Sequence, residues 1–309
     1  MIFKMYLKML YNLPEINKIN YKSINSFNIC EKNLNDKMNK IRENIIILII
    51  NKKIPNDYYK YSNRWKNLKS NINEFIDKIY SNPIKDIKGN IKAGRKNNYD
   101  FEIIINNLIF NIEFKFNSSK INDIPQFISP MKPSKYLSAS FEDYIYNNYL
   151  ISLLNKYNLN IPNKKYYDKE IHSNNPKCLY EIQEKYYRGC LSSSKYSGNI
   201  EDIEFYKEAN KYSQESIIEF IKNTELDIIK LSDYLKKTQE NKIYMLYYKN
   251  KIYKETIDND NFEIVSYEKR KNYYLALTKT GIYLKILLRW KNGNLIAFPA
   301  FQISIIGNK

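Results

Sequence analysis

Residues 99–116, YDFEIIINNLIFNIEFKF, are the part of the chain whose fold is most tightly constrained. Apolar and polar residues alternate on both sides of Asn106-Asn107, and two asparagines can supply the positive φ angles of a two-residue type I′ turn. Such a turn places Ile105 opposite Leu108 and brings every second residue of each arm to one face. That face is apolar throughout: Tyr99, Phe101, Ile103, Ile105, Leu108, Phe110, Ile112 and Phe114. A shift by one residue would expose all of it, so the sequence predicts a β-hairpin of defined register.

The opposite face of this hairpin carries two acids that the same register brings together. Asp100 lies directly opposite Glu113, where facing Cβ atoms are about 4.5–5.5 Å apart and like charges repel. A divalent cation between the carboxylates removes this repulsion, and carboxylate oxygens favour a hard ion such as Mg²⁺. Lys115 projects from the same face, where its ammonium can reach a metal-bound water or a phosphate. Two carboxylates and a lysine beside a metal suit the in-line hydrolysis of a phosphodiester.

Asp100, twelve intervening residues and then Glu113-Phe114-Lys115 resemble the D…(D/E)xK signature of the PD-(D/E)xK nuclease superfamily, which includes most type II restriction endonucleases. The resemblance covers about residues 65–130. It implies a restriction-endonuclease-like α/β fold, with a mixed central sheet flanked by helices. It also implies that Asp100, Glu113 and the Phe114 carbonyl bind Mg²⁺, with Mn²⁺ as a substitute, and that Lys115 orients or polarises the attacking water.

Three further positions follow from this resemblance. Many members add an acid from the preceding helix, for which Glu74 is the first candidate and Glu43 the second. Some members place a glutamine in the helix after the ExK strand, and Gln126 occupies the comparable stretch. Tyr99 stands in place of the proline that names the family, a departure that many members share.

The (D/E)xK pattern alone has little specificity, because it also occurs at residues 86–88 and 240–242. The first copy lacks an upstream acid on a strand, and the second lies at a predicted helix end with no facing acid. Only Glu113 combines a strand, a facing carboxylate and an apolar reverse face. The alternative is an ordinary hairpin whose outer face is solvated, with Lys115 neutralising its neighbours.

Four basic residues are candidates for DNA contacts. Arg95 and Lys96 precede Asp100 and can hold a phosphate, although a solvated turn is an equal alternative. Arg289 and Lys291 flank a tryptophan on the approach to a predicted two-residue turn at 292–293. They can enter a DNA groove or form an exposed basic hairpin end.

The charge of the whole chain is weaker evidence than these local features. The chain of 309 residues has 50 Lys and Arg against 33 Asp and Glu, a net charge of +17 that suits a polyanionic partner. Only six of the basic residues are arginine, and Lys, Asn, Ile and Tyr are crowded together as an AT-rich coding genome produces. The charge therefore does not by itself predict DNA binding.

Cysteine usage and hydropathy predict an intracellular protein, cytoplasmic or nuclear. Cys30, Cys178 and Cys190 are odd in number and scattered, as in a reducing compartment, and no CxxC pair joins His172 in a zinc site. The N-terminus does not resemble a signal peptide. The most apolar run, residues 45–50, is far shorter than the roughly 20 residues of a membrane span, so no membrane partner is expected.

The remaining patterns predict helices and a second β-rich region. Helical spacing covers 37–52 and 65–81, a helix begins after Ser140, another ends at Gly189, and residues 200–238 are mainly helical. We expect a nuclease core over residues 1–240, with N-terminal helices and helical insertions. We expect a β-rich C-terminal portion over residues 241–309 to pack on that core.

Together these features predict a Mg²⁺-dependent endonuclease that hydrolyses phosphodiester bonds of double-stranded DNA. Sequence specificity and a homodimer are expected by analogy with many restriction enzymes. One alternative is a non-catalytic, basic nucleic-acid-binding protein. Another is a repair or recombination nuclease that acts on branched or single-stranded DNA.

Overall fold

The computed structural model describes residues 21–29, 35–92, 97–124, 128–130, 132–173, 177–191, 195–291, 293–295 and 298–306. The chain forms two compact units. Unit 1 comprises residues 1–124 and 238–258, and unit 2 comprises residues 125–237 and 259–309. Both units contain helices and strands, so the expected mixed α/β class is confirmed.

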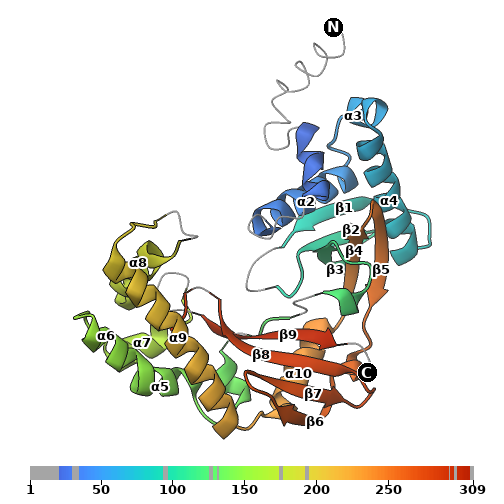
Figure 1. Cartoon of the computed structure of the whole chain (residues 1–309). Coiled ribbons are helices and arrows are strands. Elements are labelled where there is room, and N and C mark those ends of the chain that lie inside the picture. The colour runs from blue at the N-terminus through green and yellow to red at the C-terminus, as the bar shows by residue number, and fades with distance from the viewer. Residues whose placement is uncertain are drawn as a thin grey trace. The chain divides into compact units, whose positions relative to one another are not determined.

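Unit 1 is built around a five-stranded mixed sheet with the strand order β1-β2-β3-β4-β5 (Figure 1). The strands are β1 (Ile87–Ile91), β2 (Phe101–Ile105), β3 (Leu108–Phe116), β4 (Lys242–Tyr248) and β5 (Lys251–Thr256). β4 pairs in parallel with β3, and the other neighbours are antiparallel. The predicted β-rich portion after residue 240 therefore contributes its first two strands to the sheet that contains the hairpin.

The hairpin of β2 and β3 has the predicted register. Ile105 pairs with Leu108, and each further pair follows in step down to the start of β2. Asn106 and Asn107 have φ angles of 48° and 70°, as a type I′ turn requires. Local alternation and turn chemistry thus sufficed to predict this element.

The apolar face of the hairpin is buried over most of its length but not at its tip. Phe101, Ile103 and Ile112 are fully buried, whereas Leu108 is 55% exposed. β3 pairs with β4 only from Asn111 onwards, so the residues next to the turn extend beyond the body of the sheet. The face is thus apolar throughout, as predicted, but the tip of the hairpin leaves Leu108 in contact with solvent.

Helices of unit 1 cover the apolar face of this sheet. They are η2 (Tyr21–Asn28), α2 (Asn35–Ile50), α3 (Asn56–Tyr61) and α4 (Asn63–Ile79), and a short 3-10 turn, η4 (Ile121–Asp123), follows β3. α2 and α4 correspond to the predicted helices 37–52 and 65–81. Ile46 of α2 and Trp65 of α4 are fully buried in one core with the apolar side chains of the hairpin. This packing fixes the position of α2 against the strands that carry Asp100 and Glu113.

The side chain of Asn106 ties the hairpin turn to the segment before β1. Its Oδ1 accepts hydrogen bonds from the backbone N–H groups of Lys85 and Asp86 at 2.9 and 3.1 Å, and its Nδ2 donates to the Pro83 carbonyl at 2.8 Å. We predict that Asn106→Ala lowers the free energy of unfolding by about 1–2 kcal/mol, because these groups lose their partners. Asn107→Gly, which suits the positive φ, is the matched control and should change it by less than about 0.5 kcal/mol. Urea denaturation of both variants measures the difference, and equal midpoints would contradict the prediction.

Unit 2 combines a four-stranded antiparallel sheet with a group of helices. Its strands are β6 (Ile264–Lys269), β7 (Tyr273–Thr278), β8 (Tyr283–Trp290) and β9 (Pro299–Ile306). Its helices are α5 (Phe141–Ile145), α6 (Ile151–Lys156), α7 (Lys164–Glu170), α8 (Tyr180–Gly189), α9 (Ile200–Asn223) and α10 (Ile228–Gln239), the last of which ends in unit 1. Shorter turns are η5 (Pro133–Tyr136), a π-helical turn η6 (Tyr146–Leu150), η7 (Lys177–Leu179) and η8 (Asn259–Phe262). In the part of the chain that the structure describes, no helix is long and apolar enough to cross a membrane.

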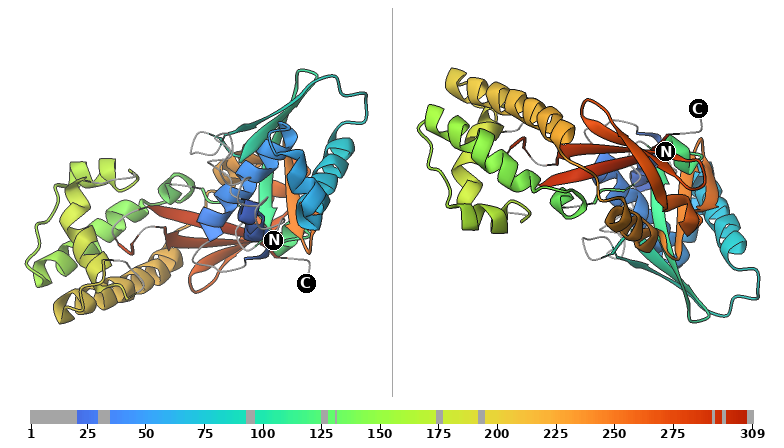
Figure 2. Two further views of the ribbon diagram at one scale, coloured as in Figure 1. Left: turned by 90° about the horizontal axis from the view of Figure 1, so that it is seen from above. Right: turned by 90° about the horizontal axis from the view of Figure 1, so that it is seen from below.

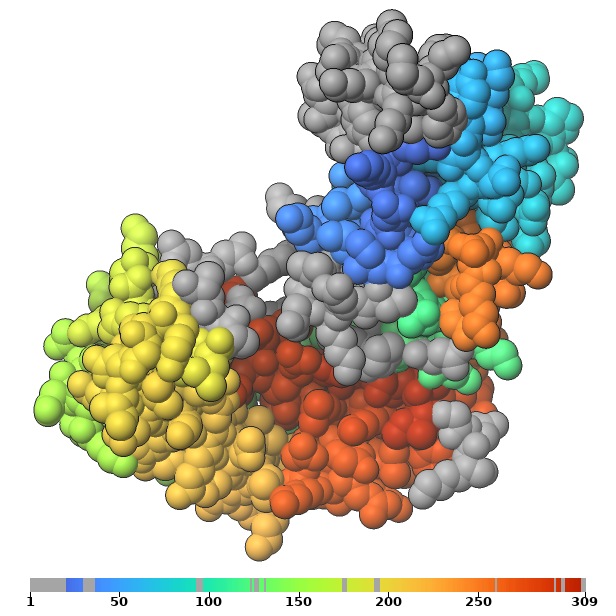
Figure 3. Space-filling model, turned by 45° about the horizontal axis from the view of Figure 1, so that its top comes forward, coloured from blue at the N-terminus to red at the C-terminus, as the bar shows by residue number. Residues whose placement is uncertain are grey.

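Two helix boundaries of unit 2 agree with the sequence. The Ser140 hydroxyl accepts a hydrogen bond from the Asp143 N–H at 3.1 Å and caps α5, as predicted. α8 ends at Gly189, where an added Cβ would lie 1.8 Å from the Asp202 carbonyl oxygen. α8 and α9 lie side by side, and their surfaces adjoin in the space-filling view (Figures 2 and 3). Glycine is therefore needed at position 189 for the close approach of the two helices.

The connection between β8 and β9 differs from the predicted two-residue turn. Trp290 pairs with Pro299, so residues 291–298 join the two strands. Leu295 and Phe298 of this connection are buried, and the gain from burying two large apolar side chains outweighs the preference for a short turn. Pro299 begins β9, the last strand of the four-stranded sheet, where a residue without an N–H is tolerated.

Candidate functional site

Backbone hydrogen bonds hold Asp100 beside β3, one residue before β2 begins. Its N–H donates to the Ile112 carbonyl at 2.9 Å, and its Oδ2 accepts a hydrogen bond from the Phe114 N–H at 2.8 Å. The strand register itself ends at the pair Phe101–Ile112, and these two contacts hold Asp100 against β3 just beyond it. Burial and then the charge of Glu113 raise the pKa of Asp100 to about 6, against the lowering effect of Lys115. The two acids therefore lie close enough for their charges to interact, while the direct facing pair stays a prediction.

Glu113 is contacted by two lysines, one at each carboxylate oxygen. Lys115 Nζ lies 2.5 Å from Oε1, and Lys242 Nζ lies 3.7 Å from Oε2. Burial lowers the pKa of Lys115, but the charges of Glu113 and Asp100 outweigh it and the net shift is upward. Lys115 therefore stays protonated near neutral pH, so it can orient and polarise a water molecule but cannot accept its proton.

A third acid, Glu43, reaches the same group from α2. Its residue surface is 7% exposed. Burial and then the charges of Asp100 and Glu113 together raise its pKa to about 8, against the lowering effect of Lys115. Glu74, the first candidate from the sequence, is exposed on α4, and its carboxylate accepts a hydrogen bond from the Ser70 hydroxyl at 3.4 Å. Glu43 is thus the candidate whose charge interacts with the hairpin acids.

Sequence reasoning missed Lys242 and ranked Glu43 second, after Glu74. The parallel pairing of β3 with β4 sets Asn111 beside Lys242, and from there the lysine reaches Glu113 two residues along. The signal was present in the sequence as the second (D/E)xK copy, residues 240–242. We predicted that this copy had no facing acid, but its lysine, Lys242, contacts Glu113.

The same face of the hairpin carries one more acid, Glu102, whose hydrogen-bond and ion-pair partners are not those of Glu113. Its Oε1 accepts a hydrogen bond from the Tyr99 hydroxyl at 2.8 Å, and Lys92 Nζ lies 3.3 Å from its Oε2. These contacts explain why Tyr99, at the end of the predicted apolar face, is only half-buried. Glu102 therefore has local partners of its own.

The donor set of the group fits a hard divalent cation only in part. Carboxylate oxygens are the ligands such an ion prefers, and the charge of Glu113 is the second cause, after burial, that raises the pKa of Asp100. However, within the described residues no three or more His, Cys, Asp or Glu side chains lie close enough together to hold one ion. Phe114, whose carbonyl was expected as a further ligand, lies between Glu113 and Lys115 on β3 with its ring buried.

The residues expected to contact DNA lie partly outside the described residues. Arg95, Lys96 and Gln126 are among those outside them. Arg289 donates a hydrogen bond to Gln302 Oε1 at 2.5 Å, and Lys291 follows at the exposed end of β8. The tryptophan between them is 5% exposed and packs against Phe141, so it does not present its ring to a ligand.

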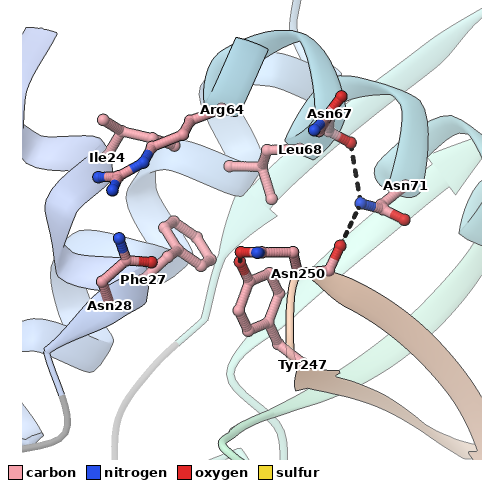
Figure 4. Close-up of a pocket in the computed structure, with 9 residues that line it drawn as sticks. All are labelled: Ile24, Phe27, Asn28, Arg64, Asn67, Leu68, Asn71, Tyr247 and Asn250. Carbon is pink, nitrogen blue, oxygen red and sulfur yellow. Dashed lines mark hydrogen bonds between the residues drawn. The ribbon is translucent and has the colours of Figure 1, made fainter.

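A separate small hollow of about 50 Å³ lies between η2, α4 and the β4–β5 turn (Figure 4). Its lining combines apolar and amide side chains: Ile24, Phe27, Asn28, Arg64, Asn67, Leu68, Asn71, Tyr247 and Asn250. Asn71 Nδ2 donates to the carbonyls of Asn67 and Asn250 at 2.9 and 2.8 Å. These bonds join α4 to the turn, and none of the predicted site residues lines the hollow.

The raised pKa values make a prediction about stability in the absence of divalent cations. Glu43 and Asp100 bind protons more tightly in the folded chain than in the unfolded chain. The protonated acids therefore add their full contribution to the free energy of unfolding below about pH 4, and this contribution is lost as the pH rises towards 8. We predict that Glu43→Gln removes most of this loss. Urea denaturation in EDTA at pH 5 and pH 8 measures it, with the exposed Glu74→Gln as the control. The prediction concerns the free energy of unfolding of the wild type minus that of Glu43→Gln, which should fall between pH 5 and pH 8. A difference that stays the same or rises would contradict it.

Comparisons with protein-family models, curated proteins and solved structures find no match to this chain.

Proposed function

We propose that the chain is a divalent-metal-dependent DNA endonuclease whose site is formed by Asp100, Glu113 and Lys115. The observation that carries the proposal is the proximity of two acids, Asp100 just before β2 and Glu113 on β3, with a protonated lysine two residues beyond the second acid. This is the arrangement that the resemblance to the PD-(D/E)xK nucleases implies. The mixed sheet that contains the hairpin also supports a restriction-endonuclease-like fold.

Each residue has a role that its surroundings favour. Asp100 and Glu113 would hold Mg²⁺ or Mn²⁺ together with the Phe114 carbonyl, and Glu43 takes the place of Glu74 as the third acid. The bound cation would lower the pKa of a water molecule and stabilise charge on the phosphate. Lys115 is held protonated by Glu113 and Asp100, so it orients that water and contributes positive charge near the phosphate.

The substrate we propose is double-stranded DNA, cut at a specific sequence by a homodimer inside the cell. The basic net charge of +17 favours a polyanion. Plasmid DNA incubated with the protein in Mg²⁺ should give nicked or linear products, and EDTA should prevent them. Activity restricted to branched or single-stranded DNA would instead identify a repair or recombination nuclease with the same site.

One observation favours a second candidate, a nucleic-acid-binding protein without catalysis. Both oxygens of Glu113 contact lysines, so its charge is neutralised within the protein itself. In that case the hairpin acids are structural, and DNA binding is the same in Mg²⁺ and in EDTA. An intact plasmid in Mg²⁺ and in Mn²⁺, together with such binding, would establish this second candidate and exclude the first.

A further inference from the structure

Lys242 is a buried cation to which the proposed function gives no role. Its side chain is only 5% exposed, and it begins β4, a strand whose next residues are largely apolar. Burying an ammonium ion is costly unless an acid compensates its charge. The acid that does so is Glu113, whose Oε2 lies 3.7 Å from Lys242 Nζ.

Glu113 does not need a second lysine for its own neutralisation. Lys115 already lies 2.5 Å from Oε1, within hydrogen-bonding distance, and one ammonium ion balances one carboxylate. The contact of Lys242 with Oε2 is longer than a hydrogen bond and depends on charge alone. Replacing Lys242 at Oε2 by another cation therefore requires less free energy than replacing Lys115 at Oε1.

The net charge of these acids and lysines determines whether a further cation is attracted to them. Glu43, Asp100 and Glu113 contribute three negative charges when ionised, and Lys115 and Lys242 contribute two positive charges. A divalent cation beside Glu113 would experience the repulsion of Lys242 at short range, where Coulomb interactions are large even with protein screening. The same positive charge would favour the phosphate of a nucleic acid.

We propose that Lys242 is an exchangeable counter-ion of Glu113, which competes with a divalent cation for Oε2 and thereby sets the metal affinity of the site. This inference rests on the proposed function, because it requires a cation that binds at Glu113. It differs from a purely structural role in one respect. A lysine that only supports the fold would not weaken metal binding, whereas a competing lysine does so directly.

The test is the affinity of the full-length protein for Mn²⁺, measured by calorimetry without DNA. Lys242→Met should bind Mn²⁺ roughly tenfold more tightly than the wild type, because a repelling charge is removed. Lys242→Arg, which keeps the charge, should bind with nearly wild-type affinity. Lys92→Met is the matched control, since it removes a lysine that pairs with Glu102 on the same sheet and should leave the affinity unchanged. Lys242→Gln provides a second neutral variant if the methionine variant does not fold.

The outcomes separate this inference from the proposed function. A wild-type protein that binds Mn²⁺ and cleaves DNA, with neutral Lys242 variants of equal or weaker affinity, would overturn the inference alone. A wild-type protein that neither binds Mn²⁺ nor cleaves DNA would overturn the proposed function and the inference with it. Tighter binding by both neutral variants, with no change in Lys92→Met, would establish the competition.

Discussion

Glu113→Gln is expected to reduce the rate of DNA cleavage in Mg²⁺ by at least about 100-fold. Even the replacement of a residue that only hydrogen-bonds to a metal ligand lowers metal affinity or activity by roughly 10–100-fold. The substitution keeps the shape of the side chain but removes the charge that faces Asp100. Both lysines keep Asp100 as a counter-charge, because its charge acts to raise the pKa of each, although burial leaves the pKa of Lys242 lowered overall. The fold should therefore be retained, which circular dichroism can verify.

The matched control for this variant is Glu74→Gln. Glu74 was the other glutamate that the sequence favoured, but it is exposed on α4. Its replacement should leave the cleavage rate within about twofold of the wild type, as for surface substitutions that touch no reacting group. Wild-type cleavage by Glu113→Gln, or an equal loss in both variants, would show that Glu113 is not part of the reacting site.

Lys115→Met is expected to lower the turnover number by about 10²–10³-fold, the range for one positioned group that stabilises developing charge in the transition state. Because Lys115 is not a metal ligand in this proposal, its loss should not weaken Mn²⁺ binding or DNA binding. The measurement is therefore a comparison of single-turnover cleavage with equilibrium binding of metal and DNA. Lys120→Met, which alters an exposed lysine shortly after β3, is the control.

A different pattern would assign Lys115 another role. If Lys115→Met loses DNA affinity in proportion to its loss of cleavage, the lysine holds the phosphate and does not act on the water. If cleavage is unchanged, the lysine only neutralises Glu113, as an ordinary solvated hairpin face would require. The second result would contradict the site assignment.

The sequence predicted the hairpin and its acids because both depend on local interactions. Alternation of apolar residues and the chemistry of Asn106-Asn107 fix the register of β2 and β3, and Asp100 follows directly before β2, where it bonds to β3. The exposed Leu108 was not predicted, because alternation does not show where the neighbouring strands end.

The remainder of the site could not be predicted, because it depends on contacts between distant parts of the chain. Glu43 reaches the hairpin acids only because α2 packs on the sheet, and the sequence also offered Glu74 on α4, the more amphipathic of the two helices. Lys242 joins them through the parallel pairing of β3 and β4, which no local pattern specifies. The burial of Leu295 and Phe298 between β8 and β9 has the same explanation, since it depends on tertiary packing.

The central claim, metal-dependent cleavage of DNA at the hairpin site, is tested most directly by sequencing the ends that the purified protein produces on a plasmid in Mg²⁺. The account predicts discrete products with ends at one short sequence, formed by the wild type and absent in EDTA and with Glu113→Gln. A plasmid that stays intact in Mg²⁺ and Mn²⁺, or is cut equally well by Glu113→Gln, would contradict it.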